Sequence, residues 1–402
     1  MTEHNIYHDI SERTDGAFLI GVVGPVRTGK STFIKRFMET MVIPRIENTY
    51  MRERARDELP QSGSGKTIMT AEPKFVPENA VSIRLDDSAE VSVRMVDCVG
   101  YMVEGAAGQF EDGSERMVTT PWFDHEISIT DAAEKGTRKV ITDHSTIGVV
   151  VTTDGSIGEI PRDHYAEAEA RVIRELKELG KPFVVLLNSA SPTAETAEAL
   201  AADIAEKNGV TCLPVNCLTL TEKEITAILR SVLYEFPLKS LGIYFPEWLE
   251  ALDNETALKA NILKVILENG EEINKIRDTS KLLDALTSQE EISEAVIADS
   301  DLGKGAVNVR IRLPRSLYYQ TISEQTGWEI RNDGDLIGTL SEMSVIKRTM
   351  TGCGKPCTTC APKAMGSSCR IPHRWSWKSR RSFGREENTR CGSRPAHRRS
   401  IC

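Results

Sequence analysis

The sequence lacks the long apolar runs that a membrane protein needs. No window of its 402 residues approaches the roughly 18 uncharged apolar residues of a spanning helix. Its beginning, MTEHNIYHDISERTDG, lacks the basic and apolar regions of a signal peptide. Hydrophobic residues make up 40% and charged residues 27%, which excludes disorder throughout, a collagen-like fibre and a small disulfide-stapled module. We therefore predict a soluble, cytoplasmic-type protein with domains of about 100 to 200 residues each.

The last 52 residues, Thr351–Cys402, lack leucine and valine altogether. They hold 12 of the 50 Lys and Arg, two of the 59 acidic residues and six of the nine cysteines. Residues 1–350 therefore carry 38 basic and 57 acidic side chains, a net charge of −19. Without core side chains the tail cannot form a packed element, and we expect it to be disordered. Its composition is typical of an out-of-frame reading of a coding region that ends in a premature stop.

The tail also leaves a functional alternative open, because it contains residues that could bind zinc or nucleic acid. The candidate zinc ligands are Cys353, Cys357, Cys360, Cys369 and His373. The net charge of +10 on the tail could attract phosphate. The cysteine spacing lacks the second regular pair that is typical of zinc sites, so this stays the alternative. Cysteines in a cytoplasmic chain are expected to be unbridged.

Apolar strands alternate with amphipathic helices through residues 1–237. Strands are expected at residues 17–23, 89–97, 146–152, 182–187 and 211–215, and helices at 30–40, 162–179, 194–207 and 222–234. Such alternation predicts βαβ units and a parallel, doubly wound α/β sheet. A smaller α+β domain is expected over residues 238–347, from a helical pattern at 246–286 and a strand at 306–313. As a domain assignment, residues 348–402 are the basic, cysteine-rich tail, which includes the 52 residues described above.

The strongest chemical signal is GPVRTGKST, which follows a predicted strand and precedes a predicted helix. It fits the pattern G-x-x-x-x-G-K-[ST], in which backbone N–H groups surround phosphate oxygens at a helix N-terminus. Lys30 is expected to reach the β and γ phosphates, and Ser31 to ligate Mg²⁺. Arg27 either contacts a phosphate or is an exposed loop charge. The predicted nucleotide-binding residues are Gly24, Pro25, Val26, Arg27, Thr28, Gly29, Lys30, Ser31 and Thr32.

Two further segments predict groups for Mg²⁺ and the γ-phosphate. In MVDCVGY, Asp97 ends a strand and Gly100 follows, so Asp97 is expected to hold Mg²⁺ through water, as the Walker-B acid does. A surface turn is the alternative. The Thr-rich segment GSGKTIMTAEPKF precedes that strand, and Thr70 is predicted to complete the Mg²⁺ and γ-phosphate shell, with Thr67 as second choice and an exposed loop as the alternative. The predicted catalytic residues are Lys30, Thr70 and Asp97.

Two absences bear on the nucleotide and on turnover. Ras-like GTPases read guanine with Asn-Lys-x-Asp after a buried strand, but here PFVVLLN ends in Asn188-Ser189-Ala190-Ser191. Without the aspartate, guanine finds no carboxylate, and ATP is favoured. Position 101 is Tyr101 rather than the water-positioning glutamine. Hydrolysis should be slow unless another group, for example from a neighbouring subunit, aligns the water, which makes self-association a natural control.

The sequence resembles the stage IV sporulation protein A family over about residues 1–347. The resemblance is carried by VVGPVRTGKSTFIKRFME, DELPQSGSGKTIMTAEPKFVP, MVDCVGYMV, GTRKVITDHSTIGVVVTTDGSIGEIPR and LYEFPL. It implies a P-loop ATPase related to translation-factor-like GTPases, with Lys30 and its loop for nucleotide, Asp97 in the Walker-B role and Thr70 in a threonine sensor. Two departures are Pro25, where a small residue is expected, and Ala71, where a second threonine is usual.

The resemblance also implies where and with what the protein works. Family members polymerise on the mother-cell face of the forespore's outer membrane, as the base layer of the spore coat. Implied partners are copies of the chain, other coat proteins and a small amphipathic protein that anchors it, so the membrane is contacted indirectly. The family continues beyond this chain with a localising region, so we expect poor assembly at the forespore surface.

Two alternative functions remain open beside this one. The fold alone permits a nucleotide-dependent translation or ribosome-assembly factor, although a net charge of −19 without a basic stripe predicts no nucleic-acid partner. The other is a coat protein that binds nucleotide without turnover.

Overall fold

The structure, a computed structural model, describes residues 6–60, 73–86, 89–106, 110–111, 114–120 and 123–352. Two compact units are present, Met1–Asn332 and Asp333–Cys402, and the second contains helix α12 (Asp333–Gly352). Thr67, Thr70 and Ala71, together with the cysteines and His373 of the tail, lie outside the described residues.

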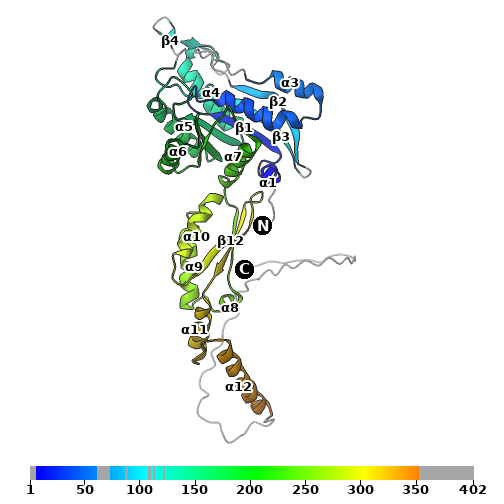
Figure 1. The fold of residues 1–402 in the computed structure, drawn as a ribbon, viewed down its shortest axis with the longest axis vertical. Helices are drawn as coiled ribbons and strands as arrows, with labels where there is room; N and C mark the ends of the chain where they lie inside the picture. The colour runs from blue at the N-terminus through cyan, green and yellow to red at the C-terminus, as the bar shows by residue number, and fades with distance from the viewer. Residues whose placement is uncertain are drawn as a thin grey trace, which may run out of the picture. The chain divides into compact units, whose positions relative to one another are not determined.

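A six-stranded sheet forms the first part of the chain (Figure 1). Its strands, in spatial order, are β10 (Cys212–Val215), β9 (Phe183–Asn188), β8 (Ile147–Thr153), β1 (Ala17–Val23), β3 (Ala89–Asp97) and β2 (Lys74–Asp86). Every neighbouring pair is parallel except β2 and β3, which run antiparallel. The predicted doubly wound α/β sheet is confirmed, and β2 adds an antiparallel edge strand that the sequence pattern did not indicate.

Helices cover both faces of this sheet because alternate side chains of its strands enter two different cores. In β8, for example, Val149 and Val151 pack in one core and Val150 in the other. The first core includes residues of α1 (Ile6–Arg13), α2 (Lys30–Phe37) and α7 (Glu222–Tyr234). The second includes residues of α4 (Ile129–Asp143), α5 (Ala166–Glu178) and α6 (Glu195–Asn208). Because five strands of the sheet run parallel, their carboxyl ends lie at one edge, where loops can form a site.

Shorter elements complete the first part. Helix α2 ends at Phe37 and is followed directly by a π-helical turn (Met38–Val42). The predicted helix 30–40 is therefore α-helical in its first part and π-helical at its end. Helix α3 (Thr49–Asp57) lies between that turn and β2 in the chain. Two small hairpins are β4 (Phe110–Glu111) with β5 (Ser114–Glu115), and β6 (Met117–Val118) with β7 (Ile127–Ser128).

The remainder of the first unit is an α+β region with a three-stranded sheet. Its order is β11 (Ser240–Tyr244), β13 (Ala306–Arg312) and β12 (Glu294–Asp301). The helices are α8 (Glu247–Glu250), α9 (Ala257–Gly270), α10 (Thr279–Thr287) and α11 (Arg315–Thr326). Buried Leu282, Val307 and Val309 belong to the same apolar core as α7. Among the described residues, no helix has both the length and the apolar character to cross a bilayer.

Candidate nucleotide-binding site

The loop Gly24–Gly29 joins the end of β1 to the start of α2, as predicted. Gly24 has φ 136°, and a Cβ atom there would lie 2.2 Å from the carbonyl oxygen of Val151 on β8. Only glycine therefore permits the loop to leave the sheet at this point. The loop thus lies over the carboxyl ends of β1 and β8, where open α/β sheets bind ligands.

Lys30 is buried at the start of α2, and its ammonium group is held by the loop itself. Its Nζ donates to the carbonyl oxygen of Pro25 at 2.5 Å and to that of Gly24 at 3.4 Å. Burial lowers the pKa of Lys30, against the opposing influence of Cys98 and Asp97. A buried cation that only carbonyl oxygens hold is well placed to take phosphate oxygens instead, because an anion offsets its desolvation.

The side chains of Ser31, on α2, and Asp97, at the end of β3, are in contact. Both residues are predicted Mg²⁺ ligands. The Ser31 hydroxyl donates to Asp97 Oδ2 at 2.6 Å. Burial raises the pKa of Asp97, although the hydrogen bond from Ser31 opposes the rise. The other oxygen, Oδ1, is buried and has no hydrogen-bond partner among the described residues.

These two residues fit Mg²⁺. Hydroxyl and carboxylate oxygens are its preferred protein ligands, usually one or two with phosphates and water supplying the rest. A cation would also satisfy the unpaired oxygen of Asp97 and favour the ionised carboxylate. Among the described residues there is no group of three or more His, Cys, Asp or Glu side chains that could hold a metal alone.

The segment after Asp97 is bonded to the loop through its backbone. Gly100 has φ 95°, and a Cβ atom there would lie 2.1 Å from the carbonyl oxygen of Gly24. The backbone N–H of Tyr101 donates to that same oxygen at 3.1 Å, and its carbonyl oxygen accepts from Val26 at 2.9 Å. The Tyr101 side chain is buried, and its hydroxyl donates to Glu175 of α5. The side chain of Tyr101 is thus bonded within the protein interior.

Asn188 braces the loop from the end of β9. Its amide Nδ2 donates to the carbonyl oxygen of Thr28 at 3.0 Å, and its Oδ1 accepts from the backbone N–H of Cys217 at 3.0 Å. The sequence pattern presents Asn188 only as part of an incomplete base-reading motif. Its bracing role was missed because the two bonded segments lie far from it along the chain. The signal was the buried strand that ends in an amide side chain.

The residues that follow Asn188 satisfy one another. The N–H of Ser191 donates to the Ser189 hydroxyl at 3.1 Å, and that of Ala190 to the Ser156 hydroxyl at 2.9 Å. The nearby carboxylate of Asp154 accepts from both the N–H and the hydroxyl of Ser156. Burial by itself raises the pKa of Asp154, but hydrogen bonds from Ser156 and Ser189 outweigh it, so the pKa is lowered. This carboxylate is engaged in its own turn, and a serine stands where GTPases place the guanine-reading aspartate.

A buried ion pair anchors the loop between β8 and α5. Arg162 donates from Nη1 to Glu169 Oε2 at 2.7 Å and from Nη2 to Oε1 at 2.9 Å, and the Thr152 hydroxyl donates to the same carboxylate at 2.5 Å. The loop so anchored carries Ile157, whose Cδ1 would lie 3.8 Å from a Cβ atom placed on Gly29. This support of the nucleotide loop was not predicted.

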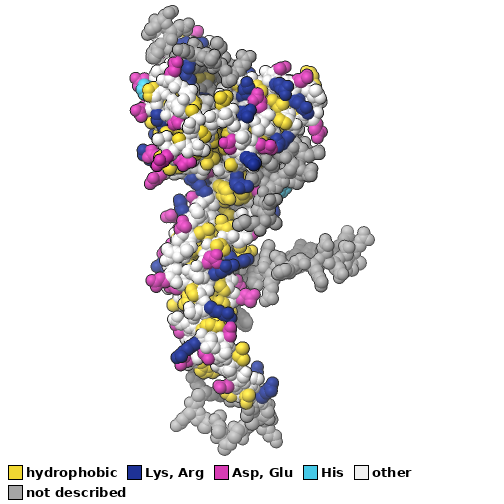
Figure 2. All heavy atoms as spheres, viewed as in Figure 1, with side chains coloured by type: hydrophobic (Ala, Val, Ile, Leu, Met, Phe, Trp, Pro, Cys, Tyr) yellow, Lys and Arg dark blue, Asp and Glu magenta, His cyan; other side chains and the backbone are white. Residues whose placement is uncertain are grey.

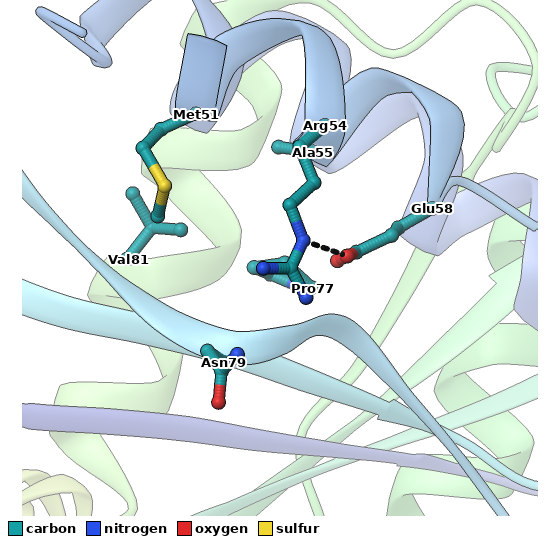
Figure 3. A pocket seen from close by; sticks show the side chains of 7 residues that line it. All are labelled: Met51, Arg54, Ala55, Glu58, Pro77, Asn79 and Val81. Atoms are coloured by element: carbon teal, nitrogen blue, oxygen red, sulfur yellow. Dashed lines mark hydrogen bonds and ion pairs between the residues drawn. The ribbon is translucent and has the colours of Figure 1, made fainter.

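A groove away from this loop lies between α3 and β2. It has a volume of about 270 Å³, and Met51 and Val81 also line a smaller hollow beside it. Figure 3 shows that hollow, in which Arg54 donates to Glu58 at 2.7 Å. On the face drawn in Figure 2, acidic and basic side chains are interspersed.

The fold and the site together define the P-loop class of nucleotide-binding proteins. In this class a glycine-bearing loop joins a strand to a helix on a mostly parallel sheet, and a buried lysine lies beside a serine–aspartate pair. The profile of the stage IV sporulation protein A ATPase domain matches residues 1–237, and that of the family's middle domain matches residues 238–366.

Known proteins agree with these matches. The chain is 46% identical to stage IV sporulation protein A of Clostridioides difficile (strain 630) over 344 residues, which is 86% of this chain and 70% of that protein. The proteins of the same name from Bacillus anthracis and Bacillus subtilis (strain 168) are 45% and 44% identical over 347 residues, with the same coverage. The chain belongs to the stage IV sporulation protein A family, a sporulation family with an ATPase domain, which confirms the resemblance.

Proposed function

We propose that the chain binds ATP with Mg²⁺ in the loop Gly24–Thr32 and hydrolyses it slowly to ADP and phosphate, with turnover linked to self-assembly. The observation that carries this proposal is the hydrogen bond from Ser31 to Asp97 beside buried Lys30, with one oxygen of Asp97 left unpaired. The loop and Lys30 would bind the phosphates, and Ser31 and Asp97 would hold Mg²⁺. Mg²⁺ supplies neutralisation of the charge on the β and γ phosphates.

The preference for ATP over GTP is supported by the end of β9. The residue that would pair with the guanine ring donors is Ser191, and the carboxylate of Asp154 is already engaged with Ser156. Guanine would leave its ring donors without an ionised acceptor, so it would lose the interaction by which GTPases discriminate in its favour. Adenine has no such requirement.

The proposed cellular role is the base layer of the spore coat around the forespore, in the mother-cell cytoplasm at the outer surface of the forespore outer membrane. The proposed partners are further copies of the chain, other coat proteins and a small amphipathic protein that links it to the membrane. Family membership supports this role. The net charge of −19 on residues 1–350 supports a set of partners without nucleic acid.

Nucleotide binding and phosphate release in Lys30→Ala and Asp97→Ala variants test this proposal. Lys30→Ala should abolish ATP binding, because the phosphates lose their buried cation. Asp97→Ala should keep most of the binding but lower turnover about 100-fold or more. Lys35→Ala, on α2 but outside the loop, is the matched control and should resemble the unmodified chain. Unlabelled GTP should displace ATP poorly.

Sedimentation of polymers, measured on the same samples, separates the remaining alternatives. Assembly should require turnover and fail in both site variants. Binding and assembly without phosphate release would instead support a coat protein that only binds nucleotide. Equal displacement by GTP would contradict the assignment of the base-reading strand.

A further inference from the structure

The place after Gly100, where Ras-like enzymes carry the water-positioning glutamine, is taken by a tyrosine among the described residues of this site, so turnover would depend on other groups. Tyr101 occupies the position after Gly100, but its hydroxyl donates to Glu175 and its carbonyl oxygen accepts from Val26. In P-loop enzymes an arginine, supplied in cis or in trans, can stabilise the negative charge of the transition state. The arginines to consider are Arg27, Arg162 and Arg171.

Two of these arginines are committed to carboxylates. Arg162 forms a two-pronged pair with Glu169, and Arg171 forms one with Glu134, at 2.5 and 2.6 Å. Arg27 differs from both. Its side chain is exposed, and no carboxylate among the described residues lies within ion-pair distance of it.

The backbone of Arg27 is held in a conformation that arginine does not favour. Its φ is 62°, in the left-handed region, where a side chain with a Cβ atom is strained. Both neighbours are fixed: the N–H of Val26 donates to Tyr101, and Thr28 bonds to Pro25 through its hydroxyl and to Asn188 through its carbonyl oxygen. Strain that the surrounding structure imposes is characteristic of functional sites.

The charge of Arg27 is felt by its surroundings. Burial raises the pKa of Tyr165, and the positive charge of Arg27 opposes that rise. Tyr165 itself is buried at the end of the 3-10 turn Arg162–Tyr165. Arg27 is therefore an exposed cation within the phosphate loop, without an ion-pair partner among the described residues.

We propose that Arg27 is a catalytic residue that stabilises, in cis, the charge developing during ATP hydrolysis. This inference rests on the proposed ATPase function. In the reaction, the water oxygen forms a bond to the γ-phosphorus while the bond from that phosphorus to the β,γ-bridging oxygen breaks. The electron pair leaves with ADP, and the proton of the water passes to the released phosphate. The guanidinium of Arg27 donates hydrogen bonds to the phosphoryl oxygens and bridging oxygen that gain charge.

The first test uses Arg27→Asn, because asparagine tolerates the left-handed backbone but carries no charge. Affinity for ADP and for a non-hydrolysable ATP analogue should stay within about threefold of the unmodified chain, whereas affinity for ADP with aluminium fluoride, which imitates the transition state, should fall about 100-fold or more. Arg27→Lys should recover only part of the affinity for ADP with aluminium fluoride, since lysine lacks the planar guanidinium that donates two parallel hydrogen bonds. Arg230→Asn, an exposed position on α7, is the matched control and should change nothing.

Turnover provides a second readout. Phosphate release by Arg27→Asn should fall about 100-fold, and millimolar guanidinium should restore part of it, which a purely structural role would not allow. The melting temperature should be unchanged or higher, because the strained backbone is relieved.

Mixing experiments distinguish action in cis from action in trans. Arg27→Asn mixed with Lys30→Ala should show no recovery of turnover, and recovery would overturn the cis assignment. Undiminished aluminium fluoride affinity and turnover in Arg27→Asn would overturn the inference while leaving the ATPase proposal intact. Absence of turnover in the unmodified chain would overturn both.

Discussion

At the scale of single residues, Tyr101 joins the loop Gly24–Gly29 to helix α5. Its backbone bonds to Gly24 and Val26, while its buried hydroxyl donates to Glu175, which Arg171 also approaches at 3.3 Å. Burial, together with the acceptor and charge of Glu175, raises the pKa of Tyr101 well above its ordinary value. The residue therefore stabilises the loop as a neutral phenol.

This neutrality predicts a pH dependence of stability. An unfolded tyrosine ionises near pH 10, but folded Tyr101 keeps its proton, so its contribution is present below about pH 10 and is lost as the pH rises further. Between about pH 10 and 11, the free energy of unfolding should fall by about 1 kcal/mol more in the unmodified chain than in Tyr101→Phe. Urea denaturation measures this, with exposed Tyr50→Phe as control. Parallel pH profiles of Tyr101→Phe and the unmodified chain would contradict the assignment.

At the scale of elements, the loop between β8 and α5 depends on one buried ion pair. Glu169 is buried on α5 and accepts from Arg162 and from Thr152 at the end of β8. Removal of one partner of a buried pair leaves the other charge uncompensated, which costs more than the pair contributes. The same loop places Ile157 beside Gly29 of the nucleotide loop.

Glu169→Gln should therefore lower both stability and nucleotide affinity. We expect the free energy of unfolding to fall by about 3 kcal/mol, because Arg162 loses its counter-charge. The Kd for ATP should rise at least about threefold, since Ile157 is no longer held beside the loop. Urea denaturation and fluorescence titration measure the two effects. Glu167→Gln, exposed on the same helix, should leave both unchanged, and an equal effect there would argue against the ion pair.

At the scale of the whole molecule, buried Glu235 links the two parts of the first unit. It lies just after α7, accepts a hydrogen bond from Lys275 at 2.8 Å and forms an ion pair with Arg277 at 2.9 Å, both in the segment before α10. The hydroxyl of Thr211, next to β10, donates to the same carboxylate at 2.5 Å. Main-chain bonds accompany it, such as that from Ile276 to Phe236 at 3.1 Å. The connection after α7 is therefore a packed joint.

A double-mutant cycle on Glu235→Gln and Arg277→Gln should give a coupling energy of about 1 to 3 kcal/mol, because the carboxylate is buried. The matched control is the pair Glu294 and Arg312, whose side chains are 44% and 59% exposed. It should give less than about 1 kcal/mol, since solvent screens an exposed pair. Urea denaturation of the single and double variants measures both. Equal coupling in the two pairs would contradict the proposed joint.

How far the fold could be predicted depended on how local its signals were. The strand, loop and helix around Lys30 form a continuous stretch, and the buried strands β8 and β9 are nearly all apolar, so each was predictable from neighbouring residues. Strand β2 was missed because proline and charged residues interrupt its pattern, and α3 because only Ala55 of its nine residues is buried. Their neighbours in space, rather than their own periodicity, define these elements.

The candidate site divides in the same way. The identities of Lys30, Ser31 and Asp97, the absence of the guanine-reading aspartate and the acidic balance of residues 1–350 were determined by the sequence alone, since they depend on residue type and short spacing. Only the tertiary structure decided that Asn188 braces Thr28, 160 positions away, and that Tyr101 turns its hydroxyl to Glu175, 74 positions away. It also decided the left-handed backbone of Arg27. Such contacts depend on strand order and helix packing, and no short spacing encodes them.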